Sequence, residues 1–249
     1  MPVGYAHDAI ERSDHGLVVG RIQYWKGVTI LCEAMRLLNS VALRIDWLGR
    51  DTAYQQLGGS MAQYLAQHYP ELWSTTIRPI GTLAPDKTRK LQAAAGFILV
   101  PSIWDVFNYT CIEGMAQAQT VLCSLGAGAS DLITNGVNGF TFTANDPYAL
   151  AEKLEALFSL SKSERKQIGE AAQQTIQTQL APAKIAQQRV AAYEKLLHRG
   201  KCATRPNPWL VDAVSPGQSL EKPLAFLDLL PLKELSTYIL KRSFQKVMK

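Results

Sequence analysis

Two cationic side chains with the spacing of an anion site lie near the start of the chain, in the segment Gly20-Arg21…Lys26-Gly27. The segment follows a β-branched apolar run and precedes an apolar helical pattern, so the cations lie close to a helix N-terminus. Helix N-termini favour anions because free backbone N–H groups and the macrodipole point there. The cluster therefore indicates a diphosphate site, where Arg21 and Lys26 would stabilise the charge of a departing group. On spacing alone, two solvated loop cations are the commoner interpretation.

A second cluster, PSIWDVFNYTCIEGMAQA, begins at Pro101 and combines two carboxylates with the start of a helix. Asp105 lies in the loop, and Glu113 falls in the first turns of the helix. Helical side chains lean toward the N-terminus, so Glu113 can reach a ligand at that end. The two carboxylates could hold different hydroxyl-bearing parts of one ligand, above the backbone amides of Asn108, Tyr109 and Thr110. The alternative is a favourable dipole partner at Glu113 and an exposed loop acid at Asp105.

Taken together and in this order, the two clusters resemble the C-terminal domain of glycosyltransferase family 4, the retaining enzymes of the GT-B fold. The family pattern G-R-x4-K-G, followed by P-S-x2-E-x-F-G-x4-E-A-M-A, is met by GRIQYWKG and PSIWDVFNYTCIEGMA. The downstream segments NGVNGF and ALAEKLEAL match as well. The resemblance extends from about Val3 to Leu197 and thus covers nearly one whole domain.

The resemblance implies a role for each residue of the two clusters. Arg21 and Lys26 would bind the donor diphosphate and stabilise its developing charge, and Glu113 would hold the ribose hydroxyls. Asp105 would meet the donor sugar, and the nucleobase would lie near residues 80–83. The amides of Phe107 and Asn108 would contact the sugar, and those of Tyr109 and Thr110 the distal phosphate. The complete set of implied substrate contacts is Gly20, Arg21, Lys26, Asp105, Phe107, Asn108, Tyr109, Thr110 and Glu113. Arg21, Lys26 and Asp105 would be the catalytic members of this set.

The chain departs from the family pattern at several positions of the second cluster. Asp105 replaces the first Glu of the E-x7-E pair and is about one methylene shorter, and Asn108 stands where a Gly is usual. Gly114, Ala118 and Thr120 replace an Ala, a Gly and a Pro. The departures at Asp105, Asn108 and Gly114 favour a second hypothesis, a non-catalytic nucleotide-sugar-binding module that regulates or scaffolds a partner in glycan synthesis. The intact cations and Glu113 favour a hexosyltransferase.

The elements that must position these residues alternate between strands and helices. Short apolar runs predict strands at residues 17–21, 42–49, 74–80, 96–100 and 120–124, and helical periodicity predicts helices at 27–38, 60–69, 86–95, 109–118 and 146–158. Asp86 is expected to cap the third of these helices, and Asp146-Pro147 to open the fifth. Continuous apolar strands separated by helices predict an α/β fold with a Rossmann-like parallel sheet and helices on both faces. Ligands of such sheets bind beyond the carboxyl ends of the strands.

Two further helices are predicted at residues 161–180 and 181–199, and a Pro-rich stretch follows Gly200. We therefore expect a nucleotide-sugar-binding domain at residues 1–199, and a linker with a basic amphipathic C-terminal helix at residues 200–249. Three interpretations fit that helix: a solvated tail, a contact with an acceptor domain, or peripheral contact with an anionic membrane.

The resemblance covers the donor-binding part of such an enzyme but not the part that binds the acceptor. Members of the family begin with another Rossmann-like domain that binds the acceptor, and this chain begins where that domain should have ended. The missing N-terminal acceptor domain would come from a longer protein or from a partner polypeptide. UDP-glucose is the favoured donor and GDP-mannose the second choice.

Composition excludes several other classes of function. The four cysteines lack C-x-x-C spacing, and three of them (Cys32, Cys111 and Cys123) fall in apolar patterns, which predicts reduced core residues of a cytoplasmic protein. Scattered histidines and the lack of a D-x-D tripeptide predict metal-independent chemistry without a cofactor. The net charge of +5 comes without the dense Lys/Arg patches of nucleic-acid binders. No G-x-G-x-x-G follows the first strand, which argues against a dinucleotide-dependent dehydrogenase.

Overall fold

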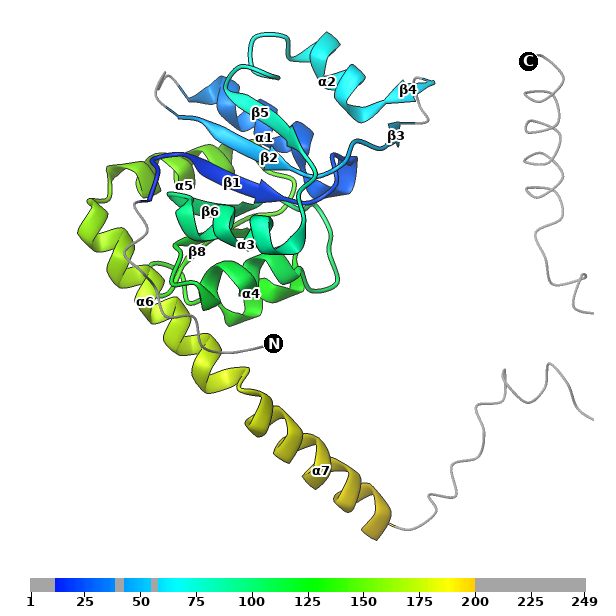
Figure 1. Ribbon diagram of the computed structural model, residues 1–249, viewed down its shortest axis with the longest axis vertical. Helices are drawn as coiled ribbons and strands as arrows, with labels where there is room; N and C mark the ends of the chain where they lie inside the picture. The colour runs from blue at the N-terminus through cyan, green and yellow to red at the C-terminus, as the bar shows by residue number, and fades with distance from the viewer. Residues whose placement is uncertain (1–11, 39–42, 55–57, 200–249) are drawn as a thin grey trace, which may run out of the picture. The chain divides into compact units, whose positions relative to one another are not determined.

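The computed structural model describes residues 12–38, 43–54 and 58–199 (Figure 1). Its centre is a six-stranded sheet in the order β5-β2-β1-β6-β7-β8, with every neighbouring pair parallel. The strands are β1 (Gly16–Val19), β2 (Ile45–Leu48), β5 (Ile77–Gly81), β6 (Phe97–Val100), β7 (Val121–Ser124) and β8 (Phe140–Phe142). The predicted parallel α/β sheet is confirmed.

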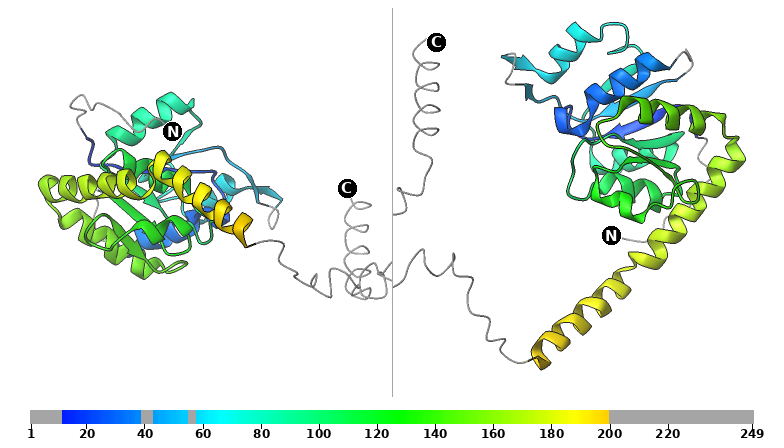
Figure 2. Two further views of the ribbon diagram at one scale, coloured as in Figure 1. Left: turned by 90° about the horizontal axis from the view of Figure 1, so that it is seen from below. Right: turned by 180° about the vertical axis from the view of Figure 1, so that it is seen from behind.

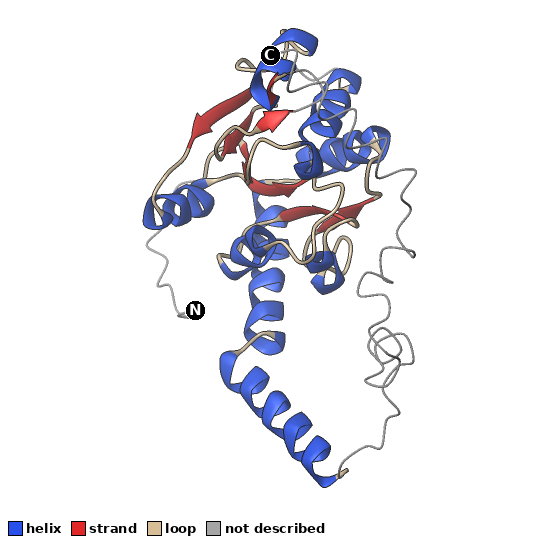
Figure 3. Ribbon diagram, turned by 90° about the vertical axis from the view of Figure 1, so that its right-hand side faces the viewer, coloured by secondary structure: helices blue, strands red, loops and turns tan. Residues whose placement is uncertain are grey.

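Helices cover both faces of this sheet, as the prediction required. Figures 1 and 2 show α1 and α5 on one face and α3 and α4 on the other, and Figure 3 shows the strands in red between helices in blue. Helix α5 packs on α1, and α6 packs on α4. The helices are α1 (Val28–Leu37), α2 (Met61–His68), α3 (Pro85–Ala94), α4 (Tyr109–Ala116), α5 (Pro147–Ser159), α6 (Lys162–Gln179) and α7 (Pro182–His198).

Strands β1 and β6 are apolar along their whole length because each of their faces contributes to a separate core. Successive strand residues point to opposite faces, so Leu17 and Ile98 pack with residues of α4 and α6. Their neighbours Val18 and Leu99 pack with residues of α1 and α5. Burial on both sides explains why these runs show no alternation of polar and apolar residues.

The sequence analysis did not predict strand β8 or the ribbon of β3 (Ala53–Tyr54) and β4 (Gly59–Ser60), and it assigned one helix N-cap wrongly. Strand β8 has three residues, and the antiparallel β3–β4 ribbon has two in each strand, so neither shows a period. Helix α3 begins after Ala84, with Pro85 as its first residue, and Asp86 therefore lies inside the first turn. The fixed φ of proline suits the first helical position, which leaves Asp86 one residue too late to cap.

Other local predictions are confirmed. The Asp146 side chain accepts from the backbone N–H groups of Tyr148 and Ala149 and caps α5. The start of α6 also has a capping box of Ser161 and Glu164, which the sequence analysis did not predict. The three predicted core cysteines are buried free thiols, and burial raises the pKa of Cys32 to about 12.

The C-terminal region carries predictions that stay predictions. The predicted linker and basic helix lie in residues 200–249, outside the described part of the chain. Cys202 and the C-terminal side of the predicted domain boundary lie there too. Helix α7 has no buried residue. Within the residues that the structure describes, none of the helices has the length and apolar composition to cross a bilayer.

Candidate functional site

The two predicted clusters meet at the carboxyl ends of two neighbouring central strands. The first cluster follows β1 and the second follows β6, and these strands pair side by side. After β1 the chain continues toward β2, whereas after β6 it continues toward β7 on the other side. Such a reversal opens a crevice at the strand ends, which is where ligands of doubly wound sheets bind.

Close backbone contacts lock the two loops together. Gly27 has a φ of +76°, and a Cβ atom there would lie 1.7 Å from the carbonyl oxygen of Pro101. The N–H of Ile103 donates to the carbonyl of Trp25 at 2.8 Å, and the Thr110 hydroxyl donates to the carbonyl of Val19 at 3.0 Å. A glycine is therefore required at position 27 both for its conformation and for the space that Pro101 takes.

Lys26, Asp105 and Asn108 form the polar centre of this junction. The Lys26 Nζ atom lies 2.5 Å from Asp105 Oδ2, and Asn108 Nδ2 donates to the same oxygen at 2.9 Å. The Lys26 and Asp105 side chains are 25% and 18% exposed, so the pair is open to a ligand on one side. One carboxylate thus neutralises the cation that was predicted to meet a diphosphate.

Asn108 shows how the chain accommodates its departure from the family's glycine. Its φ is +72°, a region that asparagine tolerates far better than most residues with a side chain. The Asn108 side chain also accepts from the N–H of Cys111 at 3.3 Å and so caps α4. The substitution therefore places a side chain at a positive φ and adds three side-chain hydrogen bonds, which join Asn108 to Asp105, Ser102 and Cys111.

Glu113 is half-buried on α4 and is held by a residue that the sequence analysis did not single out. The Gln92 Nε2 atom of α3 donates to Glu113 Oε2 at 3.1 Å, and Gln92 is fully buried. Gln117 Nε2 lies 3.4 Å from Gln92 Oε1 and extends the network. A buried glutamine among apolar residues needs partners, but only the tertiary fold shows that one of them is Glu113.

Gly20 and Arg21 follow directly after β1, ahead of Lys26 in the same loop. The indole N–H of Trp47, a fully buried side chain of β2, donates to the Gly20 carbonyl at 2.8 Å. The Lys26 side chain passes over Gly20, with its Cγ, Cδ and Cε atoms 3.8–4.0 Å from where a Cβ would stand. Arg21 is exposed and has no hydrogen-bond or ion-pair partner among the described residues, so the structure does not join it to the Lys26–Asp105 pair.

The remaining predicted contacts lie around the start of α4. Phe107 packs against the α4 core and meets Tyr109 edge-to-face at 6.0 Å. Tyr109 is 65% exposed and Thr110 is buried. In the part of the chain that the structure describes, the N–H groups of Tyr109 and Thr110 have no acceptor, whereas the next one is capped by Asn108. Two free amides therefore point out of the helix end.

The loop that carries Asp105 is itself supported by the segment after β7. The N–H of Asp105 donates to Gly126 at 2.9 Å, and the N–H of Gly128 donates to Asp105 at 3.1 Å. A Cβ on Gly126 or Gly128 would come within 2.2–2.3 Å of a carbonyl oxygen in the Asp105 loop. These glycines allow two loops to lie in direct backbone contact.

Two further predictions concern the nucleobase and metal ions. Residues 80–83, which were expected to lie near the nucleobase, are at the end of β5, and 81–83 are exposed. Among the described residues, no three His, Cys, Asp or Glu side chains gather as ligands of a metal ion would.

Comparison with known proteins relates this chain to glycosyltransferases. An uncharacterized glycosyltransferase of Methanocaldococcus jannaschii is 26% identical over 155 residues, or 62% of this chain and 41% of that protein. The lipopolysaccharide 1,2-N-acetylglucosaminetransferase of Salmonella typhimurium is 25% identical over 176 residues, or 69% of this chain and 45% of that protein. The chain thus spans less than half the length of these two relatives.

Solved structures show the same architecture. A glycosyltransferase from Rickettsia africae superimposes with a TM-score of 0.64 at 25% identity, over 74% of this chain and 48% of that one. A protein from Anabaena solved in complex with UDP has a TM-score of 0.63 at 21% identity, over 73% of this chain and 48% of its own. The family described as "Glycosyl transferases group 1" matches residues 8–175, and the chain belongs to that family.

Proposed function

We propose that this chain is the nucleotide-sugar-binding domain of a retaining glycosyltransferase, with the donor diphosphate bound where the loops after β1 and β6 meet. The observation that carries the proposal is the Lys26–Asp105–Asn108 cluster at this switch point of the sheet. It combines a cation, a carboxylate and free helix-end amides, which are the groups that a diphosphate and a sugar need from a protein.

The diphosphate would be held by charge and by backbone dipoles. Arg21 and Lys26 would pair with its oxygens, and the free N–H groups of Tyr109 and Thr110 would bind the distal phosphate. When the bond from the sugar to the phosphate breaks, the diphosphate takes the electron pair and gains negative charge. The two cations would stabilise that charge more strongly than the charge of the intact donor, which is what accelerates a reaction.

The two carboxylates would bind the remainder of the donor. Asp105, with the amides of Phe107 and Asn108, would contact the sugar, and Glu113 would accept hydrogen bonds from the ribose hydroxyls. The Asn108 contact holds the Asp105 carboxylate in one orientation, and Gln92 does the same for Glu113. Asp105 neutralises Lys26 in the structure, so an arriving diphosphate would replace one anionic partner of this lysine with another.

The donor and the rest of the enzyme are proposed by analogy. The Anabaena protein has been solved with UDP and with UDP-glucose, which supports UDP-glucose ahead of GDP-mannose as the donor here. A solved C-terminal domain of a group 1 family protein from Francisella tularensis is matched over 88% of its length at 20% identity and a TM-score of 0.57. We therefore infer a C-terminal position for this domain and a separate N-terminal acceptor domain, without which the chain would bind donor but not transfer it.

One observation favours a second candidate, a binding module without turnover. Asp105 is shorter than the family's glutamate, and one of its oxygens is already engaged by both Lys26 and Asn108. A carboxylate held in this way could position a sugar without assisting its departure. Turnover measured after the chain is combined with an acceptor domain separates the two candidates, because only the transferase consumes donor.

A thermal-shift screen of UDP, GDP, ADP and their sugars, followed by calorimetric titration, tests the donor site. A ligand that binds only the folded state raises stability by RT ln(1 + [L]/Kd). We expect UDP and UDP-glucose to give the largest shifts. Absence of binding for all these nucleotides at millimolar concentration would overturn the proposal.

A further inference from the structure

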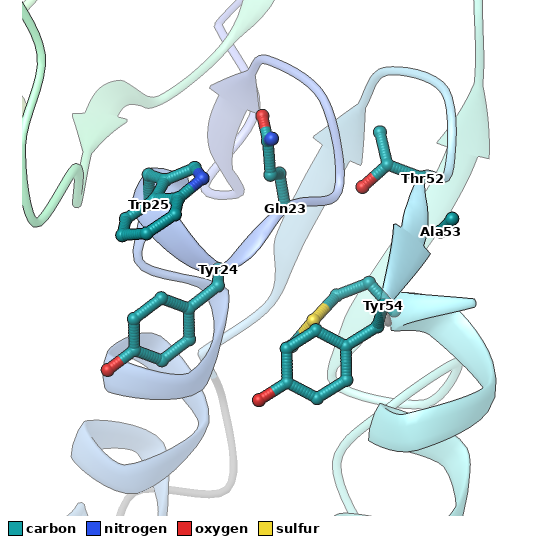
Figure 4. Close-up of a pocket in the computed structure, with 7 residues that line it drawn as sticks. Gln23, Tyr24, Trp25, Thr52, Ala53 and Tyr54 are labelled. Carbon is teal, nitrogen blue, oxygen red and sulfur yellow. The ribbon is translucent and has the colours of Figure 1, made fainter. Parts of the chain in front are cut away.

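A cavity of about 440 Å³ lies on the side of the β1–α1 loop that faces β3 (Figure 4). Gln23, Tyr24 and Trp25 border it from the loop, and Thr52, Ala53 and Tyr54 border it from the segment around β3, with Met61 of α2 completing the lining. Pockets for small ligands measure roughly 300–1,000 Å³. The cavity therefore has the size of a ligand site, and none of its lining residues belongs to the proposed donor site.

Aromatic rings form much of the wall. Tyr24 and Trp25 are 37% and 54% exposed and meet edge-to-face at 5.6 Å. On the other side Tyr54 packs on Tyr64 at 5.1 Å. In Figure 4 the hydroxyl ends of Tyr24 and Tyr54 are directed the same way. Rigid rings with an apolar face and a polar end are typical of binding surfaces, because they lose little conformational entropy when a ligand binds.

The cavity carries no formal charge, which separates it sharply from the neighbouring donor site. Its lining contains neither acidic nor basic side chains. Burial, with Tyr64 and Tyr24 nearby, raises the pKa of Tyr54, so this ring stays neutral at physiological pH. The polar groups are the Gln23 amide, two phenolic hydroxyls and the Thr52 hydroxyl, which donates to the Ile22 carbonyl at 2.7 Å. A phosphate would find no counter-charge here, whereas an uncharged ligand with hydroxyl edges and apolar faces matches the lining.

We propose that this cavity binds a neutral saccharide, a unit of the acceptor glycan that extends beyond the part held by the N-terminal acceptor domain. Pyranose rings carry hydroxyls at their edges and C–H groups on their faces, which suits aromatic walls with amide and hydroxyl groups between them. The identification as acceptor rests on the proposed function, since a sugar-transferring enzyme must also bind the molecule that receives the sugar.

The β1–α1 loop connects the two sites. Lys26 faces Asp105, and the three residues before it line the cavity. The Trp25 carbonyl accepts from Ile103 of the β6–α4 loop, so its backbone belongs to the donor junction while its ring borders the cavity. A saccharide in the cavity would therefore lie beside the loop that holds the donor diphosphate.

Saturation-transfer-difference NMR on the full chain tests the site directly. The probes are maltose, cellobiose, lactose and mannobiose, with uridine as a competitor and a parallel calorimetric titration of UDP. We expect at least one disaccharide to receive saturation at its ring protons. Tyr24→Ala and Trp25→Ala should each weaken this binding about tenfold, the order of one lost aromatic contact. The affinity for UDP should stay within about twofold in both variants, because neither side chain lies in the donor site.

Tyr148→Ala is the matched control, since Tyr148 is 72% exposed on α5 and outside the cavity. It should leave disaccharide binding unchanged. The proposal is overturned if no disaccharide binds while UDP does, if uridine displaces the disaccharide, or if the control loses as much affinity as Tyr24→Ala. Failure of UDP to bind is read from the separate titration and bears on the donor site alone.

Discussion

The two sides of the β1–α1 loop differ in charge, although only a few residues separate them. On one side Lys26 pairs with Asp105, and Asn108 donates to the same carboxylate. On the other side Tyr24, Trp25 and Tyr54 line an uncharged cavity. The contrast shows how one short loop can present a charged site and a neutral site to different ligands, because its side chains leave the backbone in different directions.

The largest expected effect comes from breaking the junction on which the charged side depends. Gly27→Ala would force a side chain into the Pro101 carbonyl and into a left-handed backbone conformation. We expect the free energy of unfolding to fall by about 3 kcal/mol, from overpacking and the φ penalty together. Urea denaturation measures this loss.

Gly136→Ala is its control, because Gly136 has a φ of +78° but nothing within 4 Å of an added Cβ. It should cost only about 1 kcal/mol, the conformational part of the penalty. Equal losses for the two variants would mean that contact between the loops contributes nothing to stability.

The next effect separates the two sides by charge. Lys26→Ala should weaken UDP binding by about 1.5–3 kcal/mol, or about ten- to a hundredfold, because a charge-assisted hydrogen bond to the diphosphate is lost. Disaccharide binding in the cavity should not change. Calorimetry on both ligands measures the split. Lys153→Ala on α5 is the control, since the partner of Lys153 among the described residues is Glu152 on the same helix. If UDP bound the Lys26 variant as tightly as the parent, Lys26 would be a solvated loop residue.

A smaller effect is expected from Gln92, which donates a hydrogen bond to Glu113 of the proposed donor site. Gln92→Met keeps the volume but removes the amide that holds Glu113. We expect UDP and uridine to bind about fivefold more weakly, roughly the loss of one neutral hydrogen bond, while inorganic pyrophosphate binds unchanged. A purely structural role for Gln92 would lower the melting temperature and leave the ratio of uridine to pyrophosphate affinity as it was.

The smallest effect concerns Asp105 and differs between two ligands. Asp105→Asn removes the charge that neutralises Lys26, so UDP should bind about two- to fivefold more tightly, the range for a partly exposed ion pair. UDP-glucose should gain less or lose affinity, because the variant no longer offers a carboxylate to the sugar. Paired titrations on parent and variant give the difference. The same change for both ligands would show that Asp105 does not contact the sugar.

Much of the fold could be predicted because apolar patterns are local. Continuous runs such as 96–100 and helical periodicity such as 27–38 predicted strands and helices within a few residues of those observed. The prediction failed for β8 and the β3–β4 ribbon, whose two or three residues are too few to show a period. It also misplaced a cap at Asp86, where the backbone preference of Pro85 determines the helix start.

Some features of the proposed site could likewise be predicted from the sequence, and others could not. Gly20, Arg21, Lys26, Asp105 and Glu113 were predicted from residue type and order, and the sequence also predicted that their loops lie at the carboxyl ends of strands. The pairing of Lys26 with Asp105 was not predicted, because 79 residues separate them and no local pattern encodes such a contact. Gln92 was missed for the same reason, and so was the cavity, since its lining comes from residues 23–25, 52–54 and 61.

By itself the sequence determined the alternation of elements, the family pattern and the chemical types of the site residues, because these depend on neighbours along the chain. The tertiary structure alone decided that β1 and β6 are adjacent, that Gly27 lies against Pro101, and that one loop has a charged and an uncharged side. The physical reason is that strand order and loop contacts arise from packing between segments far apart in the chain. The sequence indicates which segments form strands and helices, but not which strands lie next to each other in the sheet.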